Sequence, residues 1–269
     1  MSKGNILYCV PIVALVSASF GAKVGSSSSN AASPSPSSTA IAAAPGPQPA
    51  TNAAVYADIE KSSNWGKCSS GACSGGNSTA SYYVAPYQTS PALDGSSTEF
   101  AIAGGAYTDG LFMLQFGSDP NPSQYILDWN VYTDANAPNT AQALEFDFIQ
   151  VSGGRKYNFG SECNYTRGTW DIWNEAAMQW IQTSVPCNKF TPNVWHHLRW
   201  SYERVGAQTH YLSLTVDNVT YPISSTYAYQ PAPGTSWANG AMVFQVQQDL
   251  NASGSSFKEW VNEVTLYTW

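Results

Sequence analysis

The chain has 269 residues, a formal net charge of −7 and 11% charged residues, where about 25% is usual. It contains no basic run, so nucleic acids and anionic membrane surfaces are poor partner candidates. Aromatic residues reach 13%, with 10 tryptophans and 16 tyrosines, which suits a neutral ligand that has apolar faces and many hydroxyl groups, as sugars have. The alternative is that these rings mainly fill a β core.

Residues 1–22 have the pattern of a signal peptide. Lys3 precedes an apolar run over residues 6–16, and mostly small residues follow it. This order is typical of export signals, and the run is too short to span a bilayer. We therefore expect a protein that is secreted, periplasmic or held at the cell surface, without insertion into the membrane.

Residues 23–54 form a low-complexity segment. Ser, Ala, Pro and Gly dominate it, so it cannot bury enough apolar surface to offset the entropy cost of ordering. We expect a disordered linker, which acts either as a tether or as a tail without a role. The remaining residues, 55–269, suit one large domain.

Four cysteines remain after the signal peptide. An even number in an exported chain predicts two disulfides, and three pairings are open. We favour Cys68–Cys73, which closes a short Gly/Ser loop, and Cys163–Cys187, which would brace a predicted hairpin. A zinc site is the weaker alternative, because no histidine stands near either pair.

The domain has the pattern of a chain of short strands with turn signals between them. We find no convincing helix, and residues 175–177 suit either one helical turn or a loop. About a dozen strands without helices predict an all-β antiparallel sandwich. The expected strands span residues 81–84, 98–103, 111–116, 125–132, 143–151, 156–163, 169–174, 179–183, 195–202, 211–217, 219–224, 242–248 and 261–269.

The strand at 143–151 is the one on which the function depends. Its centre reads Leu144-Glu145-Phe146-Asp147-Phe148, so large apolar residues alternate with acidic ones. Glu145 and Asp147 therefore point to one side of the sheet, away from the apolar side. This acidic side is either a solvated outer face or the floor of a polar cleft.

A hairpin at Gly153–Gly154 would pair the next strand with this one. Counting outward from the turn places Glu162 opposite Glu145, and Asn158 on the same side as Glu162. Two opposed carboxyl groups would raise one another's pKa, as a general acid needs. Glu162 is therefore a candidate catalytic residue beside Glu145.

The strand at 242–248 has the same alternation. Phe244 and Val246 would point inward, which turns Gln245, Gln247 and Asp249 outward. These side chains, together with Asn158 and the carboxylates, offer donors and acceptors for sugar hydroxyl groups.

Tryptophans complete a hypothetical sugar site. Trp170, Trp173 or Trp180 could stack on a pyranose ring, because a sugar has an apolar face. The alternative is that these rings pack the core or brace Cys163–Cys187.

Metal ligands are sparse. His196, His197 and His210 are the three histidines, and no spacing brings them together as a metal triad. We expect no metal centre and no cofactor. Structural calcium stays open because carboxylates are present, although no D-x-D-x-D-G run supports a dedicated loop. The chain also lacks a G-x-S-x-G elbow and a phosphate-binding loop.

Two late segments carry a resemblance to a known superfamily. Residues 195–200, Trp-His-His-Leu-Arg-Trp, and residues 212–218, Leu-Ser-Leu-Thr-Val-Asp-Asn, resemble the W-H-H-L and L-x-L-x-V-D-G pair of laminin-G-like and other concanavalin A-like jelly rolls. The likeness extends over about residues 75–269 and includes secreted bacterial proteins with this domain. It implies a concanavalin A-like antiparallel sandwich, but a shared fold does not establish function.

The same resemblance implies a partial catalytic strand. Glu145-x-Asp147 lies where family-16 glycoside hydrolases carry E-x-D-x-x-E or E-x-D-x-E, which implies Glu145 as nucleophile and Asp147 as its support. The final acid is replaced by Gln150, or by Ile149 in the shorter motif, and neither can donate a proton. Retaining hydrolysis needs two carboxyl groups about 5–5.5 Å apart. Glu162 is the candidate for the missing acid.

Three functions follow as hypotheses. We expect a monomeric, lectin-like domain that binds a neutral extracellular polysaccharide or oligosaccharide in a concave cleft. The first alternative is a glucanase-like glycoside hydrolase that uses Glu145 with Glu162 or Asp147. The second is an adhesive or structural extracellular domain without a small ligand.

Overall fold

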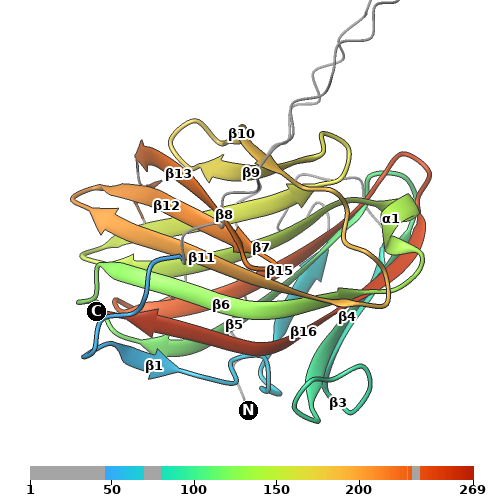
Figure 1. The fold of residues 1–269 in the computed structure, drawn as a ribbon, viewed down its shortest axis with the longest axis horizontal. Helices are drawn as coiled ribbons and strands as arrows, with labels where there is room; N and C mark the ends of the chain where they lie inside the picture. Colours follow the sequence, from blue (N-terminus) through green and yellow to red (C-terminus); the bar gives the residue numbers. More distant parts are fainter. Residues whose placement is uncertain (1–45, 70–79, 229, 232–236) are drawn as a thin grey trace, which may run out of the picture.

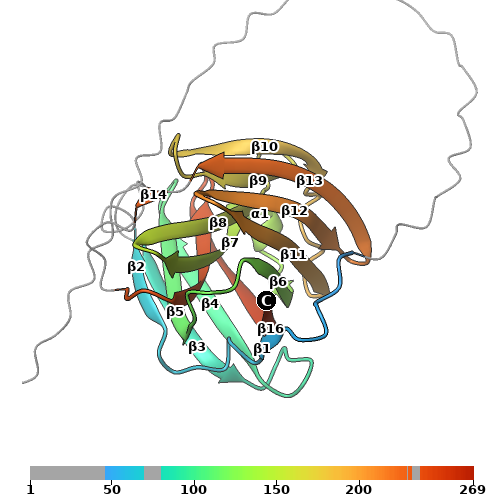
Figure 2. The ribbon, with the colours of Figure 1, turned by 90° about the vertical axis from the view of Figure 1, so that its left-hand side faces the viewer.

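The structure is a computed structural model that describes residues 46–69, 80–228, 230–231 and 237–269. Two antiparallel sheets of eight strands each lie face to face (Figures 1 and 2). The predicted concanavalin A-like jelly-roll sandwich is thus confirmed as an all-β antiparallel fold, with more strands than expected. The expected signal peptide and most of the expected linker lie outside the described residues, so both stay predictions.

The first sheet contains the C-terminal strand β16 near its centre. Its main path runs in the order β13-β12-β11-β6-β16-β4-β3, and β1 pairs with β16. The bounds are β1 Ala54–Tyr56, β3 Ser81–Gln88, β4 Ser97–Gly104, β6 Gln124–Thr133, β11 Trp195–Val205, β12 Gln208–Val216, β13 Val219–Ala228 and β16 Ser255–Thr268.

The second sheet contains the acidic strand at its centre. Its main path runs in the order β10-β9-β8-β7-β15-β5-β2, and β14 pairs with β8. The bounds are β2 Gly66–Ser69, β5 Asp109–Ser118, β7 Ala141–Ser152, β8 Arg155–Asn164, β9 Thr169–Asn174, β10 Gln179–Pro186, β14 Gln230–Pro231 and β15 Ala241–Leu250.

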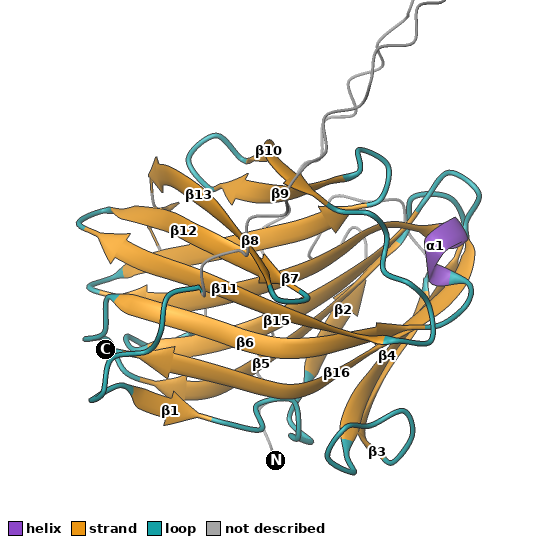
Figure 3. Cartoon of the chain, viewed as in Figure 1, coloured by secondary structure: helices purple, strands orange, loops and turns teal. Residues whose placement is uncertain are grey.

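Helix contributes almost nothing to the described chain. One turn, α1, spans Ala137–Thr140 with Pro138 near its start, and leads into β7 (Figure 3). The segment 175–177, for which a helical turn or a loop was expected, lies in a turn over residues 175–178 between β9 and β10. No helix among the described residues has the length and apolar character needed to cross a bilayer.

Aromatic side chains fill the space between the two sheets. The alternation in β7 sends Leu144, Phe146 and Phe148 inward, and all three are fully buried. Burying one such side chain stabilises the fold by about 1.5–3 kcal/mol, so these positions fix which side of β7 faces the core. The other large, fully buried rings include Phe100, Phe112, Trp129, Phe159, Trp200 and Phe244.

One predicted disulfide is present and the other falls partly outside the described chain. Cys163, near the end of β8, is bonded to Cys187 after β10, with 5.5 Å between the Cα atoms. Cys68 is also disulfide-bonded, but Cys73 lies outside the described residues. A disulfide at Cys163 removes the zinc alternative for that pair.

The end of the expected linker touches the domain. Arg199 of β11 donates a hydrogen bond of 2.9 Å to the Pro47 carbonyl. Gly46 approaches β12 and β13 so closely that a Cβ there would lie 3.0 Å from the Thr215 hydroxyl. The described part of the segment expected to be a linker therefore lies against the first sheet.

Candidate functional site: an acidic face on the second sheet

The outward side of β7 is acidic, as its alternation predicts. Glu145 and Asp147 point away from the core side chains of the same strand. β8 pairs with β7 in the predicted register, so Glu162 lies directly opposite Glu145, and Gly160 lies opposite Asp147. The two glutamates are therefore neighbours on adjacent strands.

The next strand of the sheet adds amides and a further acid. β15 places Gln247 opposite Glu145 and Gln245 opposite Asp147. Asp249 lies opposite Ala143, whose small side chain leaves space beside Glu145. We call the outward side of these three strands the acidic face, and its members are Glu145, Asp147, Asn158, Glu162, Gln245, Gln247 and Asp249.

Amide groups donate to the acids of this face. Gln245 Nε2 donates to Asp147 over 2.7 Å, and the backbone N–H of Ser161 donates to the other Asp147 oxygen over 3.2 Å. Asn164 Nδ2 donates to Glu162 over 2.9 Å, and Gln247 Nε2 donates to Asp249 over 3.0 Å. Glu145 shares a hydrogen bond with Asp147, which is itself an acid.

Three carboxylates converge on one point. Glu145, Glu162 and Asp249 each place an oxygen within 4.8 Å of the others. Calcium accepts such oxygen ligands, so this is a group that could hold the structural calcium left open by the sequence. Carboxylates alone do not define a cation site, and the structure offers no further observation in favour of an ion.

Burial raises the pKa of every acid in this group. Glu145 and Glu162 are 5% and 4% exposed, and burial followed by neighbouring carboxylates raises both pKa values well above the usual range. Burial also raises the pKa of Asp147 to about 7 and that of Asp249 to about 8. Mutual repulsion and lost hydration both favour the protonated forms.

The cations near this face are engaged elsewhere. Lys156 lies 2.5 Å from Glu175, and Arg167 lies 2.7 Å from Asp171. Among the described ion pairs, none joins a lysine or arginine to Glu145, Glu162 or Asp249. The residues that the structure describes therefore place no paired lysine or arginine at the centre of the face.

Tryptophans of β9 and β10 border the face. Trp173 is buried, its indole N–H donates to Glu175, and its ring meets Trp180 with 5.2 Å between centroids. Gly160 leaves room for this arrangement, because a Cβ at that position would lie 2.9 Å from Trp173 Cβ and 3.1 Å from Asp147 Oδ1. Trp173 thus lies close to Asp147, and Trp180 lies one strand further from the acids, opposite Trp173.

Trp170 does not belong to this face, and the expectation that it stacks on the same ligand is wrong. It is 1% exposed and packs in the core, edge-on to Trp200 with 6.2 Å between centroids. The alternation of β9 explains this, because Asp171 and Trp173 take the outward side and Trp170 and Ile172 the inward side. Its alternative role, packing beside Cys163, is the observed one.

Gln150 is also a core residue, not a replacement for the missing acid on the face. It is fully buried, donates to the Asp119 carbonyl over 2.9 Å and accepts from Tyr125 and Arg204. The pairing of β7 with β8 is regular through this stretch, so Gln150 points to the same side of the sheet as Phe148, toward the core. Ile149 occupies the outward position of the shorter motif.

Asn158 and Trp237 complete the surroundings. Asn158 is 6% exposed, and its side-chain oxygen has no hydrogen-bond partner. Trp237, which the sequence did not single out, packs on an apolar group on the same side of the sheet. The apolar group comprises Leu111, Met113, Ile149 and Val243, with Cys68 beside it.

The three histidines and the two hollows described here lie away from the acidic face. His196 pairs with Asp217 at 2.6 Å and His197 with Asp128 at 2.8 Å. A hollow of about 310 Å³ near His196 and the Cys163–Cys187 disulfide lies at the edge of the sandwich. A second, of about 190 Å³, includes residues of β10 and β13. The expected concave cleft thus stays a prediction.

Comparison with known proteins gives likeness of fold alone. No family model matches the chain, and no curated protein matches it. Arcelin-5, a lectin-like defence protein from Phaseolus vulgaris, is 10% identical with a TM-score of 0.44, over 81% of this chain and 98% of that chain. A carbohydrate esterase of the Shiga toxin-encoding bacteriophage phi24B is 11% identical with a TM-score of 0.44, over 79% and 96%.

A third similar structure is a carbohydrate-binding module from the β-sandwich superfamily. It is 9% identical with a TM-score of 0.41, over 77% of this chain and 58% of that chain. With TM-scores below 0.5 and such low identities, none of these structures says what this chain binds.

Proposed function

We propose that the chain is an extracellular glycan-binding domain whose ligand lies on the acidic face and carries no negative charge. The observation that carries the proposal is the convergence of Glu145, Glu162 and Asp249 within 4.8 Å, beside the amides of Gln245 and Gln247. Five carboxylate and amide side chains on three adjacent strands offer paired acceptors and donors, which is the chemistry that hydroxyl groups of a sugar require. A polyanionic glycan would meet repulsion here.

The tryptophans at the border supply the apolar part of such a site. Trp180 is partly exposed and packs on the buried Trp173 at the β9–β10 side of the face, where its ring could rest on the apolar face of a sugar. The disulfide at Cys163 agrees with export, because disulfides persist in oxidising compartments. Location outside the cytoplasm is part of the proposal.

A panel of insoluble and soluble polysaccharides tests this function. Retention of the chain in native affinity gels is the expected result, and Gln247→Ala with Asp249→Asn should abolish it. Glu203→Gln, on β11 of the other sheet, is the control and should keep retention unchanged. If no uncharged or cationic glycan retains the protein, binding at this face is wrong and the adhesive alternative gains ground.

Glycoside hydrolysis is the second candidate, because Glu162 lies directly opposite Glu145. A retaining mechanism needs one carboxylate as nucleophile and one carboxylic acid as proton donor, about 5–5.5 Å apart. In this reading Glu145 attacks the anomeric carbon, Glu162 protonates the leaving oxygen, and Asp147 holds Glu145 by their shared hydrogen bond.

Two single variants test the hydrolase hypothesis. Glu145→Gln and Glu162→Gln should each lower the rate at which reducing ends are released by about two orders of magnitude or more, while the protein is still retained by the glycan in gels. If the unaltered chain releases no reducing ends from any glycan that it binds, the acidic face binds without hydrolysis.

A further inference from the structure

The acidic face has more acceptors than donors. Its centre holds the carboxyl groups of Glu145, Glu162 and Asp249, and the hydrogen bonds described for these groups come from amides or from another acid. Carboxylates in low-dielectric surroundings are costly unless a cation or several donors compensate them. The described lysines and arginines nearby are paired with Glu175 and Asp171 instead.

Asn158 adds an independent sign of a missing donor. It lies on the strand and side of Glu162, and diagonally across from Asp147 in the β7–β8 register. Its side chain is more than nine-tenths buried, yet its oxygen has no hydrogen-bond partner. A buried acceptor without a donor costs about 1–3 kcal/mol, so a ligand that brings donors to this face would recover that free energy.

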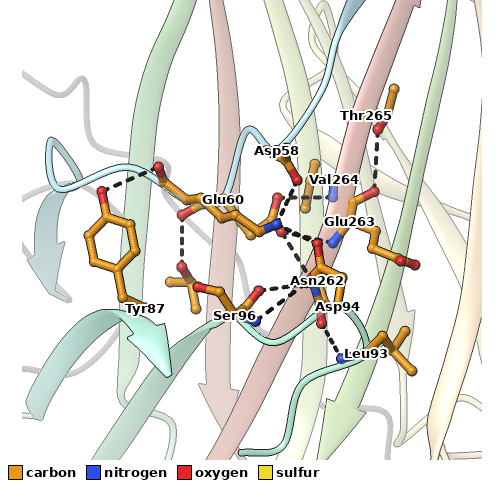
Figure 4. A network of polar contacts seen from close by, with 12 residues as sticks. Asp58, Glu60, Tyr87, Leu93, Asp94, Ser96, Asn262, Glu263, Val264 and Thr265 are labelled. Carbon is orange, nitrogen blue, oxygen red and sulfur yellow. Dashed lines mark hydrogen bonds and ion pairs between the residues drawn. The ribbon is translucent and has the colours of Figure 1, made fainter. Parts of the chain in front are cut away.

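The molecule shows elsewhere how it compensates grouped carboxylates. In a network at β16, the carboxylates of Asp58 and Asp94 both contact the Lys61 ammonium, and the Asn262 amide donates to Asp94 over 2.9 Å (Figure 4). An ammonium group with three N–H donors is thus the internal solution for two acids beside an amide. The acidic face has the acids and the amides of such a network, and the described residues place no ammonium in it.

We propose that the acidic face recognises glycans that carry a primary amine, such as polymers of 2-amino-2-deoxy-glucose. The ligand ammonium takes the place among Glu145, Glu162 and Asp249 that Lys61 takes between Asp58 and Asp94. Neighbouring hydroxyl groups donate to Asn158 and accept from the amides of β15. This specificity rests on the proposed glycan-binding function and names the substrate class of the same face.

Three oligosaccharides of equal length and linkage test the proposal by calorimetric titration near neutral pH. They are the oligomers of glucosamine, of N-acetylglucosamine and of glucose. We expect the glucosamine oligomer to bind roughly tenfold more tightly than the other two, which is about 1.4 kcal/mol. Added salt should weaken this difference, because an ion pair is screened.

Paired variants separate a local site from attraction by the net charge. Glu162→Gln with Asp249→Asn should abolish the preference for the amine. Glu203→Gln with Glu263→Gln removes the same formal charge from the first sheet and should leave the preference intact. Thermal melts should be used to check that both double variants are folded. The comparison of the three oligomers on the unaltered chain does not depend on any variant.

Each remaining outcome decides a different point. Equal binding of all three oligomers overturns the amine specificity and leaves glycan binding standing. A preference for the amine that survives Glu162→Gln with Asp249→Asn also overturns it, because the attraction then comes from the charge of the whole chain. Absence of binding by any oligomer or polysaccharide overturns both the specificity and the proposed function.

Discussion

Two groups of carboxylates in this molecule have opposite surroundings. The acidic face on the second sheet gathers Glu145, Glu162 and Asp249, and no described ion pair joins them to a lysine or arginine. The network at β16 of the first sheet, here called the edge cluster, contains Glu60, Lys61, Asp94 and Asn262 and is saturated with donors (Figure 4). Both groups are acidic in sequence, so acid content alone does not distinguish them.

The edge cluster stabilises an irregular part of β16. Glu60 is fully buried, and its two oxygens accept the backbone N–H groups of Glu263 and Val264 over 2.8 and 3.0 Å. Those N–H groups lie at an irregularity in β16, where Glu263 has a φ of 56°. A side chain from far along the sequence thus replaces the ladder partners that β16 lacks at this point.

The pKa of Asp94 shifts in the opposite direction from the pKa values of the acidic face. Hydrogen bonds from Asn262 and Lys61 lower the pKa of Asp94, whereas burial raises the pKa of Glu145 and Glu162 well above the usual range. Burial also raises the pKa of Glu60, although backbone N–H groups and Lys61 oppose the rise. The carboxylates of Glu60 and Asp94 accept hydrogen bonds from backbone and amide N–H groups, whereas the described partner of Glu145 is another acid. Buried acids with raised pKa values are candidates for contact with an outside partner.

The same substitution in both groups should give the largest contrast. Glu60→Gln turns an amide N–H toward a backbone N–H at β16, and we expect it to lower the free energy of unfolding by roughly 2–4 kcal/mol. Glu162→Gln should change it by less than about 1 kcal/mol, because Gln has nearly the same volume and its oxygen can still accept from Asn164. Urea unfolding at neutral pH measures both.

A comparison of the two losses in the free energy of unfolding tests whether the acidic face is less important for stability than the edge cluster. Equal losses for Glu60→Gln and Glu162→Gln would mean that the acidic face is as structural as the edge cluster. Glu263→Gln, an exposed acid beside the edge cluster, controls for the loss of charge and should stay within about 0.5 kcal/mol of the unaltered chain.

The acidic face also predicts how stability depends on pH. Asp147 and Asp249 have ordinary pKa values near 3.8 and folded values of about 7 and about 8. Between these values the folded chain binds more protons than the unfolded chain, so its free energy of unfolding falls as pH rises. We expect a decrease on the order of a few kcal/mol between pH 4 and pH 8.

Urea unfolding at several pH values measures this slope. Asp249→Asn should flatten it, because the amide does not titrate. The raised pKa of fully buried Glu259 adds to the slope in the same direction, whereas the lowered pKa of Asp94 opposes it only at low pH. Stability that rises from pH 4 to pH 8 would contradict the raised pKa values of the acidic face.

Period-two alternation accounts for what the sequence could predict. It placed Phe146 and Phe148 inward and Glu145 and Asp147 outward, because a strand has only two sides. The turn at Gly153–Gly154 fixed the register that sets Glu145 opposite Glu162. These are local properties, so residues close in sequence were enough.

Contacts between distant residues could not be predicted. Glu60 contacts Asn262 and Val264, which are some two hundred positions away in the sequence. No pattern in either segment predicts that the two come together. Trp237 follows a Gly/Pro-rich stretch without alternation, so nothing in the sequence placed it beside Val243. Trp170 was misplaced because the sequence alone did not show which side of β9 faces the core.

The border of the acidic face gives a smaller effect. Gly160→Ala would place a Cβ 2.9 Å from Trp173 and 3.1 Å from Asp147, so one of these side chains must move. We expect a loss of about 1–3 kcal/mol in the free energy of unfolding and a changed tryptophan fluorescence spectrum. Gly105→Ala, where a Cβ has open space, is the matched control; if both variants behave alike, Trp173 is not held against Asp147.

The smallest effect concerns the ammonium of the edge cluster. Lys61 contacts Asp58 and Asp94, but these side chains are 58% and 31% exposed, so water screens the attraction. We expect Lys61→Met to lower the free energy of unfolding by only about 1 kcal/mol, and the pKa of Asp94, followed by NMR titration, to rise. Lys258→Met removes the contact of Lys258 with Glu99 on the same sheet and should leave Asp94 unchanged. A pKa of Asp94 that does not change in Lys61→Met would show that the Asn262 amide alone stabilises this carboxylate. The contact of Lys61 with Asp58 and Asp94 would then no longer support an ammonium group at the acidic face.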